Sequence, residues 1–243
     1  MLRSNRQFLP LLVCLLAAPL LAQKKAPEPS AISILENVEK ATAGVKDYIA
    51  TIEAQVDMER LRVPKMTATM YYRKPDKVHF DSPNFAMLPR EGIALNPAIL
   101  LERYDPAVVG VEMVDGKKLT KLQLTGKQVK IRPNLLTLWI DPTVSTIMKM
   151  ETVPYQGRVL RIEFTYAETE GYWLPVTLKA SFEMAERDTT ARRLDLGLQA
   201  PQLEEFQRPI RNGTITVKYL SYKINTGFSD DIFEKPESPP KSK

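Results

Sequence analysis

The stretch that decides the fold is residues 48–58, which read Tyr-Ile-Ala-Thr-Ile-Glu-Ala-Gln-Val-Asp-Met. Apolar residues occupy every second position, and most of the positions between them are polar. Successive side chains of a strand point to opposite faces of a sheet, so this period of two is typical of a half-buried strand. The sequence therefore predicts a long strand with one apolar face.

The same alternation recurs along most of the chain. It predicts further strands at 66–72, 78–80, 108–114, 119–125, 135–140, 146–153, 159–166, 173–184 and 214–225. Asp115-Gly116 is a strong hairpin signal, and Gln156-Gly157 and Glu170-Gly171 separate later strands. In the last strand the apolar phase shifts between Tyr219 and Leu220, which indicates a β-bulge. The count is about ten antiparallel strands.

Two helices interrupt this pattern. Ser33 and Glu36 have the spacing of a capping box, and Gly44 marks the expected end of the first helix. Its apolar stripe consists of Ile34, Leu35, Val38, Ala41, Thr42 and Val45. A proline-containing loop at 82–105 carries a second, short helix that begins at Asn96-Pro97.

A sheet of about ten strands with one apolar face must curl or close in order to bury that face. We therefore expect a mainly β (α+β) fold. It is a curved antiparallel sheet, or incomplete β-barrel, of about ten strands, with the two helices covering its mouth. Residues 187–211 are highly charged and contain two prolines, and they predict a long surface excursion.

The two ends of the chain lie outside this domain. Arg3 and Arg6 precede an apolar run at 9–22 that is too short to span a bilayer, so 1–22 is predicted to be a cleaved signal peptide. An uncleaved anchor is the alternative. Residues 23–29 are a linker, 30–234 the domain and 235–243 a disordered tail. Cys14 lies inside the apolar run, so a mature chain has no thiol for a disulfide or for catalysis.

Composition argues against several classes of function. The chain has 34 basic and 29 acidic residues, and removing the two signal arginines leaves 32 against 29, a net charge of +3. That is too small for a nucleic-acid-binding surface. With one histidine, His79, and no mature cysteine, we expect no catalytic residues, metal or cofactor. His79 should point to the polar face of its strand. Asp76 and Asp81 leave open a secreted hydrolase that uses paired carboxylates.

Several methionines of the mature chain fall on strand faces. They are Met58, Met66, Met70, Met113, Met148, Met150 and Met184. Methionine is unbranched and adaptable, so such a face suits either a methionine-rich core or a cavity that accepts variable apolar ligands. Composition alone does not separate these two interpretations.

Four motifs occur in a characteristic order. They are Tyr71–Phe80, Leu138–Pro142, Gly171–Pro175 and Ile224–Phe233. In this order the chain resembles the LolA-like superfamily of outer-membrane lipoprotein-sorting proteins, from about Ser30 to Glu234. The resemblance implies an incomplete barrel closed by helices, with a hydrophobic cavity that receives acyl chains in the periplasm. In the dedicated carrier an arginine before the proline of the first motif latches the lid. Here Lys74 stands at that position, beside Arg73, and lysine lacks the planar fork of arginine.

These observations favour a periplasmic, non-catalytic carrier of lipid or lipoprotein acyl chains. An envelope-stress sensor or protein-interaction module on the same fold is the alternative. We expect a monomer with peripheral membrane contact, which binds acyl chains or envelope proteins. Candidate cavity residues are Met66, Met70, Tyr72, Phe80, Met148, Met150, Phe164 and Phe182. Candidate lid residues are Ile99, Leu100 and Lys74. Asp230 and Asp231 are expected to cap a turn that docks Phe233.

Overall fold

The structure is a computed structural model that describes residues 29–58, 61–62, 64–82, 96–152, 158–184 and 212–234. The predicted signal peptide, nearly all of the linker, the 187–211 excursion, the tail and the Gln156-Gly157 turn lie outside these residues. Neither helix of the described part is long and apolar enough to cross a membrane.

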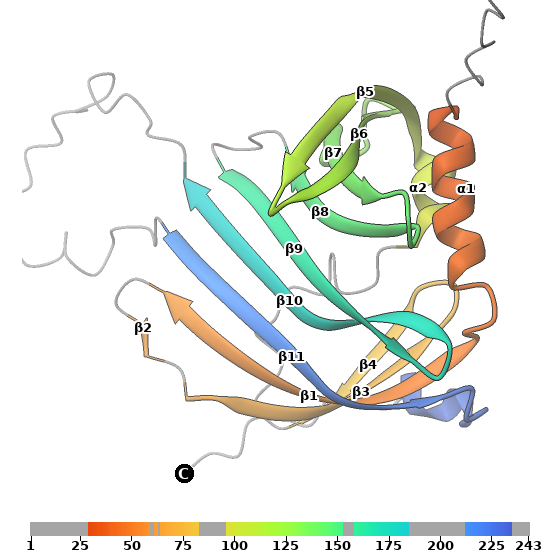
Figure 1. Ribbon diagram of the computed structural model, residues 1–243. Helices are drawn as coiled ribbons and strands as arrows, with labels where there is room; N and C mark the ends of the chain where they lie inside the picture. The colour runs from red at the N-terminus through yellow and green to blue at the C-terminus, as the bar shows by residue number, and fades with distance from the viewer. Residues whose placement is uncertain are drawn as a thin grey trace, which may run out of the picture.

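Most of the described chain belongs to one antiparallel sheet that curls strongly on itself (Figure 1). Its strands are β1 (Asp47–Met58), β3 (Met66–Arg73), β4 (Lys77–Asp81), β5 (Tyr104–Val114), β6 (Lys117–Gly126), β7 (Leu135–Asp141), β8 (Thr146–Thr152), β9 (Arg158–Thr169), β10 (Tyr172–Met184) and β11 (Asn212–Ile224). Their order is β4-β3-β1-β11-β10-β9-β8-β7-β6-β5. The two-residue strand β2 (Leu61–Arg62), which the sequence did not predict, pairs with β1. β4 and β5 are the two edges, so the predicted incomplete barrel is confirmed.

The alternation in β1 produces the buried face that the sequence predicts. Ala50, Ile52 and Ala54 are fully buried, and they pair with Met70, Ala68 and Met66 of β3. Residues of the same phase on neighbouring strands therefore form one continuous apolar core on the concave side.

The predicted bulge lies in β11. Thr51 pairs with Ser221, whereas its neighbour Ile52 pairs with Tyr219, so Leu220 is the extra residue. Leu220 is exposed, and the shift places Tyr219 and Tyr222 on the same concave face. Their rings stack 5.6 Å apart at an interplanar angle of 7°.

The helices α1 (Ala31–Ala41) and α2 (Pro97–Arg103) lie together at one end of the curved sheet (Figure 1). Asn96 caps α2 and Pro97 opens it, as predicted. The predicted cap of α1 was wrong. Ser30 is the N-cap, and its Oγ accepts a hydrogen bond of 3.1 Å from the amide of Ser33, which already belongs to the first turn.

The end of α1 also differs from the prediction. The helix ends at Ala41, with Thr42 as its C-cap, three residues before Gly44. Gly44 is needed for close packing instead, because a Cβ atom there would lie 2.3 Å from the hydroxyl oxygen of Tyr172. The glycine therefore lets the β9–β10 hairpin approach the chain that leaves α1.

The loop predicted to run to Asp105 ends earlier, because β5 begins directly after α2 at Tyr104. Pro106 is tolerated within β5 because an edge strand leaves half of its amides without a sheet partner. The predicted turns are confirmed, since Asp115-Gly116 and Glu170-Gly171 have positive φ angles at both positions.

His79 points away from the concave core, as its phase predicts. It pairs with Tyr71, whereas Phe80 pairs with Met70 of the core. It is nevertheless buried, because the aromatic ring of Tyr71 and the C-terminal 3-10 helix η1 (Asp230–Phe233) pack on this outer face.

Candidate functional site

A cavity of about 110 Å³ lies between α1 and the concave face of the sheet. Most of its lining is apolar or aromatic, and it comes from segments that are far apart in the sequence. The lining residues are Val38, Thr42, Val45, Tyr48, Tyr72, Lys74, Pro97, Ser145, Thr146, Ile147, Phe164, Tyr166, Trp173, Leu174 and Pro175. The apolar stripe of α1 therefore forms one wall, and residues of the five strands β1, β3, β8, β9 and β10 form the other.

The cavity is smaller than an acyl chain. An engineered cavity of about 150 Å³ in another protein binds one benzene ring. A chain of about 14 methylenes is several times longer than such a ring, and its transfer from water contributes roughly 11 kcal/mol. A whole acyl chain therefore fits into this cavity only after α1 or the lining side chains move.

Tyrosines form much of the sheet side of the cavity. The hydroxyl of Tyr166 donates to the carbonyl of Ile147 at 2.8 Å, and that of Tyr72 donates to the carbonyl of Pro75 at 3.3 Å. Burial, with a smaller contribution from Asp76, raises the pKa of Tyr72 to about 12. Burial also raises the pKa of Tyr48 and Tyr166. These three tyrosines are therefore uncharged at neutral pH and polar only at their hydroxyls.

One turn connects both helices to the sheet. Lys74 Nζ donates to the carbonyl of Thr42 at the end of α1, at 2.6 Å. Asn96, the N-cap of α2, donates through Nδ2 to the carbonyl of Pro75 at 2.7 Å. Burial lowers the pKa of Lys74, and Glu39 partly opposes this shift. The Lys74 contact therefore compensates part of this desolvation and connects the end of α1 to the turn after β3.

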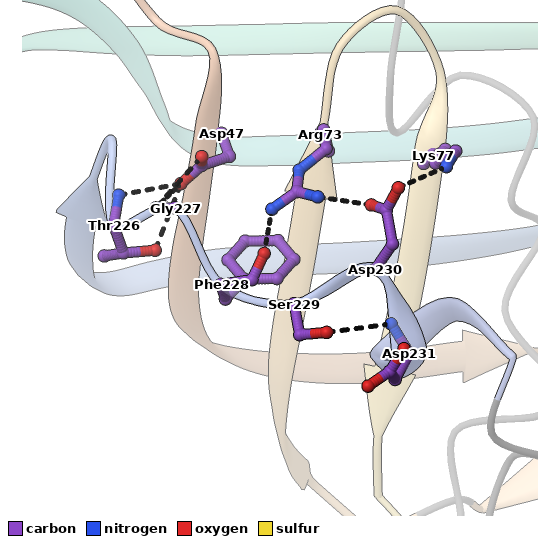
Figure 2. A network of polar contacts seen from close by, with 9 residues as sticks. All are labelled: Asp47, Arg73, Lys77, Thr226, Gly227, Phe228, Ser229, Asp230 and Asp231. Atoms are coloured by element: carbon purple, nitrogen blue, oxygen red, sulfur yellow. Dashed lines mark hydrogen bonds and ion pairs between the residues drawn. The ribbon is translucent and has the colours of Figure 1, made fainter.

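The motif at the C-terminal end packs on the outer face of the first motif (Figure 2). The buried carboxylate of Asp47 accepts hydrogen bonds from the amide of Thr226 at 2.8 Å, from its hydroxyl at 3.0 Å and from the amide of Gly227 at 3.2 Å. Asn225 bonds to the chain just before Asp47, accepting from the amide of Lys46 at 2.7 Å. These contacts fix the segment that joins α1 to β1.

Arg73 and Lys77 complete this network. The guanidinium of Arg73 donates to the carboxylate of Asp230 and to the carbonyl of Phe228, and it lies 4.6 Å from the centre of the Phe228 ring. Lys77 Nζ bonds to the other oxygen of Asp230 at 3.1 Å and, with Arg73, lowers the pKa of Asp230. The first and fourth sequence motifs therefore meet in space.

The prediction that Asp230 and Asp231 cap the turn of this motif was wrong. Ser229 is the N-cap, and its Oγ accepts a hydrogen bond of 3.4 Å from the amide of Asp231. Asp230 instead pairs with the two cations. Phe233 is half-buried and packs near Lys77, whose Nζ lies 5.5 Å from its ring centre.

The structure distributes the predicted site residues over three places. Tyr72, Phe164 and Lys74 line the cavity. Seven predicted residues do not line the cavity. Five of them are buried in the core, namely Met66, Met70, Phe80, Leu100 and Met150, and two are half-buried, namely Ile99 and Met148. Phe182 lies elsewhere, in a second hollow of about 310 Å³ beside Gly213 at another part of β9, β10 and β11.

Sequence reasoning missed two groups of lining residues, one on α1 and the segment after it and the other on β9 and β10. Val38 and Val45 belonged to the predicted helical stripe, and Trp173 and Leu174 belonged to the third motif. These two patterns were the available signals, but nothing in either pattern shows that they face each other.

The described residues contain no group of three or more potential metal ligands. The two carboxylates considered for hydrolysis are both exposed and flank β4 at opposite ends. The length of β4 therefore separates Asp76 from Asp81.

Known proteins resemble this chain in fold and not in sequence. No protein-family model and no curated protein matches the sequence. A domain from Vibrio parahaemolyticus named for outer-membrane lipoprotein sorting has a TM-score of 0.60 and 12% identity, with 84% of this chain and 95% of that one covered. A DUF1329 family protein from Desulfovibrio piger has a TM-score of 0.59 and 13% identity, over 84% and 95% of the two chains.

A LolA superfamily protein from Nitrosomonas europaea is also similar. Its TM-score is 0.53 at 13% identity, with 85% of this chain and 98% of that one covered. At such low identity these likenesses establish the fold, and they cover nearly the whole length of each solved structure. The chain therefore has the fold of the LolA superfamily and of outer-membrane lipoprotein-sorting domains.

Proposed function

We propose that this chain is a periplasmic, non-catalytic carrier that binds the acyl chains of lipids or lipoproteins beneath α1. The observation that carries the proposal is the apolar cavity between an amphipathic helix and the concave face of the sheet. The fold shared with lipoprotein-sorting domains supports it. The predicted signal peptide supports secretion into the periplasm.

The attachment of α1 gives a way for the cavity to open. Its C-terminal end is fixed through Thr42 and through the segment that bonds to Asn225. Its other end packs through Ala31 and Leu35 and exposes Ile32. Release of the C-terminal end from Lys74 would therefore widen the cavity while the other end of α1 stays packed and the sheet remains intact.

The direct test is the lipid content of the protein itself. The protein is purified from the envelope without detergent, extracted with organic solvent and analysed by mass spectrometry. We expect acylated lipid in the extract, and we expect uptake of a fluorescent fatty acid by the delipidated protein. Absence of both would contradict the proposal.

Replacing Lys74 tests the latch. Lys74→Met removes the donor to the Thr42 carbonyl and retains an apolar stem of similar length. Loss of this bond should make the release of α1 easier. Because burial offsets part of the strength of a charge-assisted hydrogen bond, we expect uptake of the fluorescent fatty acid to become about threefold to tenfold faster. Stopped-flow fluorescence measures the rate. Lys46→Met is the matched control on the neighbouring exposed residue and should retain the wild-type rate.

One further observation favours the interaction module as a second candidate. β5 is an edge strand, and Val109, Val111 and Met113 are between 49% and 65% exposed on it. Exposed apolar edges pair readily with a strand from another protein. A pull-down from envelope extract is the test. For this function, a retained partner should be lost with Val111→Lys and kept with a variant that fills the cavity.

A further inference from the structure

The hydroxyl of Tyr219 is the one buried side-chain polar atom of the described residues that has no hydrogen-bond partner. The residue is only 7% exposed. Buried hydroxyls are nearly always paired, because leaving one unpaired is unfavourable. The Tyr219 hydroxyl is therefore a candidate donor to a bound ligand.

The neighbours of Tyr219 show that a partner was available to other hydroxyls in the same cluster. Tyr222, which stacks on Tyr219, donates to the carbonyl of Pro175 at 2.6 Å. Tyr166 donates to the carbonyl of Ile147 at 2.8 Å. The bulge at Leu220 places Tyr219 in this cluster, yet its own hydroxyl reaches no carbonyl.

Tyr219 does not line the cavity itself, but ring contacts connect it to the wall. It stacks on Tyr222, whose ring centre lies 5.3 Å from that of Tyr48, a lining residue. Its own pKa is raised by burial, so the hydroxyl stays protonated and can donate. A ligand that displaces the Tyr48 ring on entry would therefore reach the stacked pair of Tyr219 and Tyr222.

The chemistry of the surroundings selects the ligand group. A hydrocarbon tail cannot accept a hydrogen bond. A carboxylate placed at Tyr219 would be buried beside neutral phenols, and the one lysine of the lining already donates to the carbonyl of Thr42, so a fatty-acid probe can bind through its chain only with its carboxylate kept away from this hydroxyl. A carbonyl oxygen is neutral and accepts readily.

We infer that Tyr219 donates a hydrogen bond to the carbonyl oxygen of an ester- or amide-linked acyl chain, so that the cavity selects acylated molecules over other apolar ones. This inference rests on the proposed function and specifies its ligand.

The test compares two probes that differ in one carbonyl group. They are monopalmitoylglycerol and hexadecylglycerol, an ester and an ether with chains of the same length. Calorimetric titration of the full mature chain should show that the ester binds about tenfold more tightly than the ether. Tyr219→Phe should lower the ester affinity to that of the ether and leave ether binding unchanged. Tyr222→Phe, whose hydroxyl is already paired, should retain the wild-type ratio.

Thermal unfolding gives an independent readout on the same variants. Tyr219→Phe should have a Tm equal to or above that of the wild type, because an unpaired buried hydroxyl is removed. Tyr222→Phe should have a lower Tm, since it leaves the Pro175 carbonyl unpaired. Equal ester affinity in wild type and Tyr219→Phe would overturn the inference alone. Failure of the wild type to bind either probe would overturn the proposed function, and this inference with it.

Discussion

Val38→Phe is expected to lower the affinity for a fluorescent fatty acid at least tenfold while the protein remains folded. Val38 is buried on α1 and lines the cavity. Phenylalanine has four more side-chain carbons than valine, and a cavity of about 110 Å³ can receive much of that added volume. The new ring would then occupy the space into which an acyl chain must enter.

Stability separates this effect from ordinary overpacking. Extra volume in a filled core costs about 1–3 kcal/mol, whereas filling an existing hollow costs little or stabilises the protein. We therefore expect the free energy of unfolding of Val38→Phe to stay within about 1 kcal/mol of the wild type. Titration of the fluorescent fatty acid and unfolding in urea measure the two quantities.

Ile32→Phe is the matched control, because it introduces the same side chain on the exposed face of the same helix. It should bind the fatty acid as the wild type does. Unchanged binding by Val38→Phe would place the acyl chain outside the cavity. The second hollow, beside Phe182, would then be the next candidate to test.

The sheet was predictable because its signal is local. In β1 the apolar residues recur with a period of two, and Asp115-Gly116 has the conformational freedom that a tight turn needs. The bulge at Leu220 was predictable for the same reason, since a phase shift within one strand is visible in one stretch of sequence.

The depth of each residue was not predictable. Alternation places Met66 and Met70 on the concave face, and the structure agrees, but it does not distinguish a cavity wall from the core. That distinction depends on where α1 crosses the sheet. His79 shows the same difficulty on the outer face, because only the distant η1 explains its burial.

The cavity itself depends on packing between distant segments. Val45 lines it together with Trp173 and Leu174, although more than a hundred residues separate them in the chain. Gly44 permits this approach, since any side chain there would collide with Tyr172. A helical stripe and a strand motif were each visible in the sequence, but their meeting was a property of the fold.

Asp47→Ala should lower the free energy of unfolding by about 2–3 kcal/mol. Asp47 is 5% exposed, and its carboxylate accepts hydrogen bonds from the amides of Thr226 and Gly227 and from the Thr226 hydroxyl. Charge-assisted hydrogen bonds contribute more to stability than bonds between neutral groups. Alanine accepts none of them, so the donors of Thr226 and Gly227 would bond only to water. Urea unfolding measures the loss.

The same substitution should release the C-terminal motif from the sheet before the rest of the domain unfolds. Hydrogen exchange at the Thr226 and Gly227 amides should become faster in Asp47→Ala and remain slower in Asp47→Asn, which keeps one acceptor oxygen. Asp81→Ala, on an exposed strand end, should change stability by less than about 0.5 kcal/mol. A loss that small in Asp47→Ala would show that Arg73 and Asp230 hold the motif without the buried carboxylate. Because the Asp47 bonds also fix the segment after α1, a larger loss should be accompanied by faster fatty-acid uptake, which would connect this network to the opening of the cavity.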